Sequence, residues 1–196
     1  MKVLNILQQH NYQLPYQIGK EIGTGADGEC FELPHHPDKV IKLSILYQTN
    51  NSNLQQLYLP ISETLHYLIV ARPSVYARVF EYQMINIWDQ GYLIYYYLME
   101  RLIPLTADEE KVFHTITSHE DRRIEKDLSE KIVNNKLMWL SKGLEFNIHK
   151  VKLLCRELQY TNIQHNDLAP RNIMKDKYNN YKIIDFDRCQ LKTLTK

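Results

Sequence analysis

Three of the six glycines fall within residues 23–28, and their spacing could support chemistry on a phosphate group. Gly23, Gly25 and Gly28 form a G-x-G-x-x-G pattern, which lets backbone N–H groups approach phosphate oxygens closely. The following segment, 29–33, is typical of a strand, whereas a dinucleotide-binding turn would open directly into a helix. On its own, the pattern fits a phosphate-binding loop and an ordinary glycine-rich hairpin equally well.

A lysine lies inside an apolar strand pattern fourteen residues after the last of these glycines. Lys42 follows two apolar residues, and a lysine in such a place usually extends its side chain to solvent. It becomes informative when a carboxylate is available as a partner, and Glu63, on the helix predicted next, is the natural candidate. Such a pair would orient the ammonium group onto the α- and β-phosphates of a nucleotide.

The most specific pattern lies near the C-terminus, where residues 165–172 read HNDLAPRN and residues 184–187 read IDFD. Here the sequence resembles the protein-kinase-like superfamily. HNDLAPRN is similar to the catalytic loop H-R-D-L-x-x-x-x-N, and IDFD is similar to the D-F-G element. The resemblance extends over residues 18–187, with the glycine loop, strand lysine, catalytic loop and metal-binding aspartate in the expected order.

The resemblance implies a role for each polar residue of these two motifs. Asp167 would accept or orient the proton of the substrate hydroxyl group. Asn172 and Asp185 would bind Mg²⁺ ions that bridge the phosphates of ATP and offset their charge. His165 is expected to support the loop from within the core rather than to transfer a proton.

The adenine of ATP would be bound by the segment that joins the two lobes of such a fold. Met99 to Leu102 falls where this hinge is expected. The resemblance implies that backbone groups of Glu100 to Leu102 hydrogen-bond the adenine, and that Met99 borders its pocket. The phosphates of the same ATP would then lie in the cleft against the glycine loop and Lys42.

Several positions depart from the pattern of protein kinases. Asn166 replaces the arginine that binds a phosphorylated activation loop in many protein kinases. Ala169 and Arg171 are similar to the residues at the same loop positions of tyrosine kinases. Asp187 replaces the glycine of D-F-G, which makes IDFD more similar to atypical bacterial sugar and lipopolysaccharide kinases. Because nine residues follow Asp187, we expect a reduced C-lobe without an activation segment or peptide-binding helices.

These observations predict an ATP-dependent phosphotransferase with a hydroxyl acceptor. The acceptor expected first is a protein Ser, Thr or Tyr side chain, including one on the chain itself. A small-molecule kinase of the sugar or aminoglycoside type is the alternative within enzymes. A nucleotide-binding pseudokinase that regulates a partner protein is the alternative outside them. A partner subunit or a second copy of the chain would complete the substrate site.

The elements predicted in the first half are mostly strands. Alternating apolar residues predict strands over 17–23, 29–33 and 38–46, and a hairpin of 79–88 and 92–99 turns at residues 89–91. Near-helical apolar spacing predicts a helix within 54–71, where Pro60 limits its start.

The second half is predicted to be helical before it ends in short strands and loops. Thr106 and Glu109 have the spacing of a capping box at a helix N-terminus. Charged residues over 118–131 predict a solvated amphipathic helix, and another helix is predicted over 147–161. We therefore predict an α+β, protein-kinase-like bilobal fold, with an antiparallel N-lobe over 1–102 and a reduced helical C-lobe over 103–196.

Composition excludes several classes of protein. The net charge of +1 gives no basic excess for a nucleic-acid partner. The three cysteines, which lack a C-x-x-C spacing, indicate neither a disulfide framework nor a zinc site. The longest apolar stretch, 92–99, is too short for a membrane helix, so a cytoplasmic location, or the cytosol of a host cell, is expected.

Overall fold

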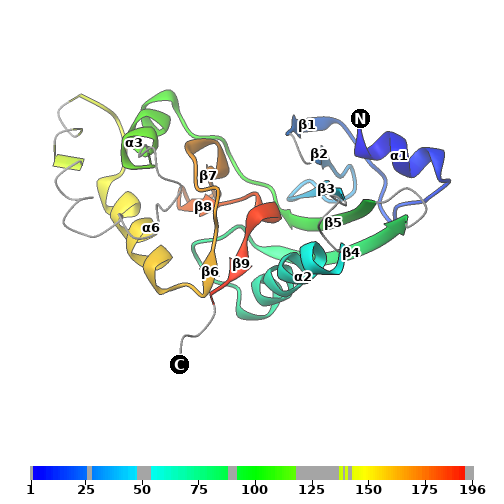
Figure 1. Cartoon of the computed structure of the whole chain (residues 1–196). Helices are drawn as coiled ribbons and strands as arrows, with labels where there is room; N and C mark the ends of the chain where they lie inside the picture. Colours follow the sequence, from blue (N-terminus) through cyan, green and yellow to red (C-terminus); the bar gives the residue numbers. More distant parts are fainter. Residues whose placement is uncertain are drawn as a thin grey trace. The chain divides into compact units, whose positions relative to one another are not determined.

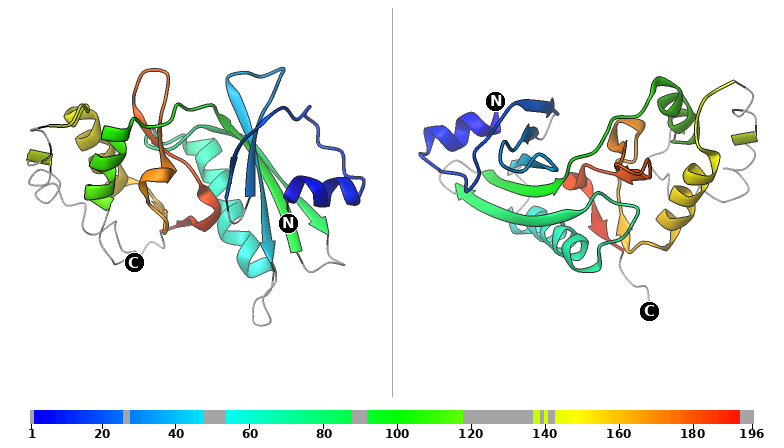
Figure 2. Two further views of the ribbon diagram at one scale, coloured as in Figure 1. Left: turned by 90° about the horizontal axis from the view of Figure 1, so that it is seen from above. Right: turned by 180° about the vertical axis from the view of Figure 1, so that it is seen from behind.

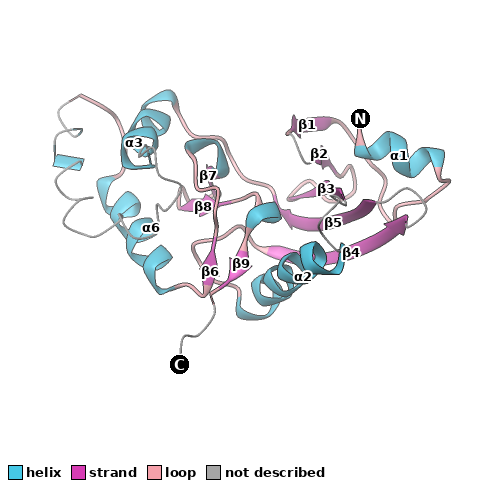
Figure 3. Ribbon diagram, viewed as in Figure 1, coloured by secondary structure: helices cyan, strands magenta, loops and turns pink. Residues whose placement is uncertain are grey.

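The computed structural model describes residues 2–25, 28–47, 54–87, 92–117, 137–138, 140 and 143–192, which fall into two compact units (Figure 1). Unit 1 comprises Met1–Arg72 and Arg78–Arg101, and unit 2 comprises Pro73–Ala77 and Leu102–Lys196. Unit 1 contains an antiparallel sheet with helices, while unit 2 contains helices and short strand pairs (Figure 3). The predicted α+β class is confirmed.

Unit 1 is organised around one five-stranded sheet. Its strands are β1 (Glu21–Thr24), β2 (Gly28–Glu32), β3 (Lys39–Tyr47), β4 (Val79–Ile87) and β5 (Tyr92–Glu100). They pair antiparallel in the order β1-β2-β3-β5-β4. The predicted strands therefore form, with their ends shifted by a few residues, and the predicted turn at residues 89–91 lies outside the described residues.

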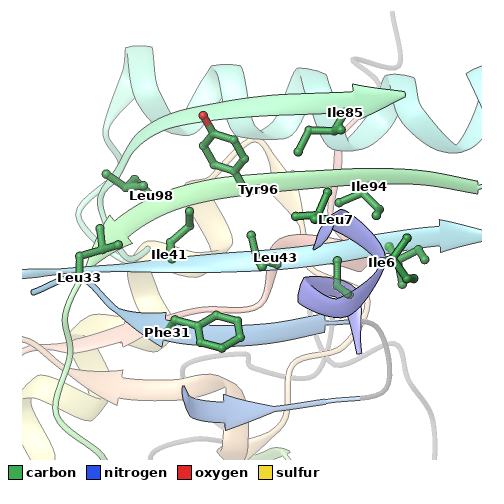
Figure 4. Packing of buried hydrophobic residues seen from close by; sticks show 12 residues of the cluster. Ile6, Leu7, Phe31, Leu33, Ile41, Leu43, Ile85, Ile94, Tyr96 and Leu98 are labelled. Atoms are coloured by element: carbon green, nitrogen blue, oxygen red, sulfur yellow. The ribbon is translucent and has the colours of Figure 1, made fainter. Parts of the chain in front are cut away.

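One face of this sheet packs against helix α1 (Val3–Gln9), which the sequence analysis did not anticipate. Val3, Ile6 and Leu7 of the helix are buried against apolar side chains of the strands, among them Ile41 and Leu43 (Figure 4). The helix has only seven residues, so its stability comes from this apolar contact rather than from its own hydrogen bonds. Because the helix spans only about two turns, its apolar residues do not repeat often enough for the sequence pattern to reveal it.

Helix α2 (Leu54–Ala71) covers the opposite face of the sheet, as three views agree (Figures 1 and 2). Its buried face contains Ile61, Thr64, Leu65 and Leu68. The helix matches its predicted bounds, but Pro60 lies inside it rather than at its start. Because proline has no backbone N–H, one hydrogen bond of this helix is missing, and the burial of the apolar face must compensate for it.

Unit 2 contains two described helices and two pairs of short strands. The helices are α3 (Ala107–Thr117) and α6 (Ile148–Tyr160). Strands β6 (Ile163–Gln164) and β9 (Gln190–Leu191) form one antiparallel pair, and β7 (Ile173–Lys175) and β8 (Tyr181–Ile183) form the other. The 3₁₀ turns η2 (Pro170–Asn172) and η3 (Phe186–Arg188) precede β7 and β9, respectively. The helix predicted over 118–131 lies outside the described residues.

The capping box predicted at the start of α3 forms, and it is part of a buried polar cluster. The Thr106 N–H donates to Glu109 Oε2 at 2.8 Å, and the Glu109 N–H donates to Thr106 Oγ1 at 3.3 Å. The same carboxylate accepts Lys175 Nζ at 2.7 Å and the Tyr181 hydroxyl at 2.9 Å. Helix α3 is thereby tied to the β7–β8 pair that follows the predicted catalytic loop.

The segment Pro73–Ala77, which joins α2 to β4, is bonded to strand β8 within unit 2. The Ile183 N–H donates to the Val75 carbonyl at 2.9 Å, and the Ala77 N–H donates to the Ile183 carbonyl at 2.9 Å. The Tyr76 ring packs edge-on against Phe186, with ring centroids 6.1 Å apart. The strand that leads to Asp185 is therefore held on this side by a segment from the first half of the sequence.

No helix within the described ranges is long and apolar enough to cross a membrane.

Candidate active site

The predicted catalytic loop runs from β6 into the turn η2, where the side chain of Asn172 fixes its shape. The Asn172 amide Nδ2 donates to the backbone carbonyl of Asp167 at 2.8 Å and lies 3.5 Å from the Asp167 carboxylate. The Asn172 N–H donates to the Ala169 carbonyl at 2.9 Å. Asn172 is buried, so these bonds hold the loop closed without competition from water.

His165 joins this loop to the IDFD segment. Its ring is fully buried, and Nε2 donates to the Ile184 carbonyl at 2.8 Å. On the other side of the residue, the Cys189 thiol donates to the His165 carbonyl at 3.7 Å. A ring held in this way is a supporting element in the core, which agrees with the role expected from the sequence.

Asp185 lies directly after Ile184, which bonds to the His165 ring and to the backbone of Asn172. The Ile184 N–H donates to the Asn172 carbonyl at 2.9 Å, so the backbones next to Asp185 and at Asn172 are bonded to each other. Asp185 itself has φ 67° and ψ 75°, a left-handed conformation that costs energy for a residue with a side chain. Within unit 2, the structure thus brings Asp167, Asn172 and Asp185 together.

The carboxylate of Asp167 carries an ion pair that the sequence analysis missed. Arg171 Nη2 lies 2.9 Å from Asp167 Oδ1 and 2.9 Å from Oδ2. The Asp167 side chain is 27% exposed and the Arg171 side chain is 67% exposed. The spacing of four residues between opposite charges was the available signal, but this spacing indicates pairing only where the backbone turns, and the 3₁₀ turn η2 was not predicted.

In unit 1, Lys42 lies at the centre of β3. It is paired across the strands with Cys30 on one side and with Tyr97 on the other. Its Nζ lies 6.0 Å from the centre of the Tyr97 ring. Burial raises the pKa of the neighbouring Cys30 thiol to about 11, although the charge of Lys42 lowers it, so this thiol stays protonated near neutral pH.

Glu63 lies on α2 with an exposed side chain. The side chains of α2 that are buried against the sheet are those of Ile61, Thr64, Leu65 and Leu68, and Glu63 is outside this face. The pairing of Lys42 with Glu63 therefore stays a prediction.

The three loop glycines differ in what their surroundings require. A Cβ atom at Gly28 would lie 2.3 Å from the Leu43 carbonyl oxygen and 2.8 Å from Ser44 Oγ, so the packing of β2 on β3 demands glycine there. Added Cβ atoms at Gly23 and Gly25 would meet their nearest neighbours at 3.9 Å, an ordinary contact distance. Packing thus explains Gly28 and leaves Gly23 and Gly25 as the glycines that a ligand could require.

The predicted hinge residues include the last residues of β5. Met99 is buried in the sheet, and the Glu100 N–H donates to the Arg78 carbonyl at 2.9 Å. The Arg101 N–H donates to the Asp38 carbonyl at 2.8 Å. Of the backbone donors in this segment, the N–H of Leu102 has no partner among the described residues.

The side-chain oxygen atoms of Asn172 and Asp185 are of the type that binds a hard divalent cation. Because Asn172 uses Nδ2 for the Asp167 carbonyl, its Oδ1 is the amide atom left to bind a cation. The carboxylate of Asp185 supplies oxygen atoms of the kind that Mg²⁺ prefers.

The α+β fold and the arrangement of this loop are typical of phosphate-transferring enzymes. A comparison with known protein families agrees with that class. The sequence model of the lipopolysaccharide kinase (Kdo/WaaP) family matches residues 120–196, which contain both HNDLAPRN and IDFD. That family belongs to the protein-kinase-like superfamily. No curated protein matches the chain.

The match confirms the resemblance to the protein-kinase-like superfamily that the motifs predicted. The chain is a kinase, a phosphotransferase that takes a hydroxyl group as acceptor. Kinases of this kind use ATP as the phosphate donor, in agreement with the predicted donor. The predicted preference for a protein Ser, Thr or Tyr acceptor gains no support from the match.

Proposed function

We propose that this chain transfers the γ-phosphate of ATP to a hydroxyl group of a saccharide. One observation carries the proposal: Asn172 is bonded both to the carbonyl of Asp167 and, through its own carbonyl, to the residue before Asp185. The three polar groups that phosphoryl transfer requires are thereby held by one network. The saccharide acceptor is favoured because the family matched over the same residues is one of lipopolysaccharide kinases.

Residues of unit 1 are proposed to bind the phosphates of the nucleotide. Lys42 supplies a cation for the phosphates, and Gly23 and Gly25, which have no Cβ atom, let the backbone of the loop approach them. The Gly25 N–H itself donates to the Gly28 carbonyl at 2.8 Å. Glu63 is retained as the residue that orients Lys42. At the adenine, the proposal is narrower than the sequence prediction, since the N–H groups of Glu100 and Arg101 already donate elsewhere. The Leu102 N–H is therefore the donor that we assign to the adenine, and Met99 borders it.

Asn172 Oδ1 and the Asp185 carboxylate are the proposed ligands for Mg²⁺. When bound, the ion would neutralise charge on the phosphates during transfer. Asp185 is held for this task by its neighbours on both sides, since Ile184 is bonded to Asn172 and His165, and the ring of Phe186 packs on Tyr76. This support also offsets the cost of its left-handed backbone conformation.

The chain contributes to the transfer mainly by positioning its substrates. The Asp167 carboxylate is proposed to accept a hydrogen bond from the acceptor hydroxyl and to take its proton as the oxygen bonds to the γ-phosphorus. The bond between the γ-phosphorus and the bridging oxygen breaks, and ADP leaves with that electron pair. Arg171 and Asn172 hold the carboxylate and its backbone in place during this step.

A panel of acceptors tests the proposal directly. The full chain is incubated with γ-labelled ATP and Mg²⁺, and with either free monosaccharides, a lipopolysaccharide core oligosaccharide or a protein mixture. We expect label on a saccharide, and we expect the Lys42→Met variant to lose it. Label confined to the chain itself or to a polypeptide would instead favour the protein acceptor. Nucleotide binding without transfer to anything would favour the pseudokinase.

The same experiment addresses the remaining predictions. A requirement for a second copy or a partner subunit would appear as a specific activity that rises with protein concentration. A cytosolic site of action is part of the proposal because ATP is available there.

A further inference from the structure

Glu29 is a buried carboxylate beside the glycine loop, and the proposed transfer step does not use it. It follows Gly28 directly on β2, and its side chain is only 3% exposed. Its Oε2 accepts the Leu4 N–H of helix α1 at 3.0 Å, while Oε1 has no hydrogen-bond partner within the described part of the chain. A buried carboxylate is costly unless charges or donors compensate it, so the residues around Glu29 must supply that compensation.

The compensation comes from the start of α1. Lys2 Nζ lies 4.0 Å from Glu29 Oε1 and 2.5 Å from Glu21 Oε2. Helix α1 has no acidic residue in its first turn and no side-chain bond at its N-cap, so Glu29 provides an acceptor that the helix itself lacks. Because Glu21 lies on β1 and Glu29 lies on β2, Lys2 connects the strand that enters the glycine loop with the strand that leaves it.

Glu29 can act on the loop only through the backbone. Successive side chains of a strand point to opposite faces of a sheet. Glu29 pairs across the strands with Leu43, on the face that packs against α1 (Figure 4), whereas Cys30 pairs with Lys42 on the other face. The contacts of Lys2 therefore hold the glycine hairpin from the side opposite Lys42.

We propose that Lys2 and Glu29 are positioning residues for the nucleotide, because their ion pair holds the base of the glycine hairpin and keeps the loop in the form that binds phosphate. This inference rests on the proposed function and extends it to residues on the far side of the sheet from Lys42. In that form the Gly25 N–H donates to the Gly28 carbonyl at 2.8 Å. A loop that is formed in advance binds ATP more tightly, since less conformational freedom is lost on binding.

The test uses four variants of the full chain. Glu29→Leu removes both contacts of the carboxylate, Glu29→Gln keeps an acceptor for the Leu4 N–H, and Lys2→Met removes the cation. The matched control is Lys20→Met, at an exposed lysine next to Glu21 whose side chain makes no hydrogen bond or ion pair with the residues that the structure describes. Calorimetric titration measures the Kd of a non-hydrolysable ATP analogue with Mg²⁺ for each folded variant.

Long-range charge and positioning predict opposite results for Glu29. If charge alone governed binding, loss of a carboxylate would strengthen binding of the anionic nucleotide, and loss of either lysine would weaken it equally. We expect Glu29→Leu and Lys2→Met to weaken binding about fivefold or more, Glu29→Gln to weaken it less, and Lys20→Met to change it by less than about twofold. Tighter binding by Glu29→Leu, or equal losses in Lys2→Met and Lys20→Met, would overturn the proposal.

Hydrogen exchange of the ligand-free chain separates this inference from the proposed function. In Glu29→Leu the Gly25 N–H should exchange faster by a larger factor than the N–H of Ile94, a fully buried residue of β5 whose exchange reports global unfolding. An equal factor for the two amides would make Glu29 a support for the fold alone and overturn the proposal. Failure of the wild-type chain to bind the ATP analogue would instead contradict the proposed function.

Discussion

The imidazole of His165 donates a hydrogen bond of 2.8 Å to the carbonyl of Ile184, the residue that precedes Asp185. One buried ring thus connects the loop that contains Asp167 to the segment that contains the proposed metal ligand. The bond needs a proton on Nε2, which the neutral ring can supply. His165 therefore has a structural role that does not require it to change protonation state.

Replacing this ring tests whether its role is structural. His165→Phe keeps a buried ring but leaves the Ile184 carbonyl without its donor, which should cost about 1–3 kcal/mol of unfolding free energy. Urea unfolding measures this loss, and the kcat for transfer should fall as Asp185 becomes less well positioned. The shape of the pH–rate profile should stay the same. A variant profile that lacks an ionisation present in the wild type would contradict the structural role and make His165 part of proton transfer.

The glycine loop allows stability and ligand binding to be separated at neighbouring positions. Gly28→Ala places a Cβ atom 2.3 Å from the Leu43 carbonyl oxygen. Such overpacking should cost about 1–3 kcal/mol of unfolding free energy. Gly25→Ala meets only an ordinary contact at 3.9 Å and should unfold like the wild type, but it should weaken ATP binding. Thermal unfolding with and without ATP measures both effects, and equal melting temperatures for the two variants without ATP would contradict this division.

Glu109 should make stability dependent on pH below its ordinary pKa. Burial alone would raise the pKa of this carboxyl, but hydrogen bonds from Lys175, the Thr106 N–H and Tyr181, with the charge of Lys175, hold it below the ordinary value of 4.5. A carboxyl with a lowered folded pKa stabilises the protein above its unfolded pKa, and this contribution is lost as pH falls through the folded pKa. Urea unfolding should therefore show wild-type stability decreasing below about pH 4.5.

The variant Glu109→Gln isolates this contribution. It leaves the Lys175 ammonium buried without a counter-charge, which should cost about 3–5 kcal/mol at neutral pH. The double variant Glu109→Gln with Lys175→Met should recover part of the loss. Some pH dependence should remain, because hydrogen bonds from Asn180 and Tyr178 and the charge of Lys182 also lower the pKa of Asp176 against the effect of burial. If Glu109→Gln were as stable as the wild type at neutral pH, the buried pair would not support the fold as described.

Asn172 should affect both the loop and the metal requirement. Asn172→Ala removes the donor to the Asp167 carbonyl and the proposed ligand Oδ1, so we expect the Mg²⁺ concentration needed for half-maximal activity to rise about tenfold or more. The matched control is Asn162→Ala, at an exposed position of the same unit. Titration of activity with Mg²⁺ at saturating ATP measures the change. An unchanged Mg²⁺ requirement with lower kcat would leave Asn172 as a support for the loop alone.

Much of the fold follows from residue patterns that act locally. The alternation around Lys42, the apolar runs of β4 and β5 and the Thr106–Glu109 spacing all led to the elements that form. These signals are reliable because a half-buried strand or a capped helix needs particular residues at a fixed period. Pro60 misled the interpretation, because apolar burial of α2 outweighs the loss of one backbone hydrogen bond.

What the pattern did not reveal depends on contacts between distant segments. Helix α1 is too short to show a clear period, and its burial depends on strands more than twenty residues away. The segment Pro73–Ala77 joins β8 only through the tertiary fold. The pairing of Arg171 with Asp167 requires the turn at Pro170–Asn172, which is stabilised by bonds to Ala169 and Ile184 rather than by residue propensities.

The most direct test of the account is phosphate transfer by the Asp167→Ala variant compared with the wild type. Both are incubated with γ-labelled ATP, Mg²⁺ and the saccharide that the acceptor panel identifies, while binding of ATP is followed separately by thermal shift. We predict that Asp167→Ala binds ATP with nearly unchanged affinity and loses transfer by a factor of about a hundred or more, as expected on removal of a general base. Transfer at the wild-type rate by Asp167→Ala would contradict the assignment of this carboxylate as the group that receives the acceptor's proton.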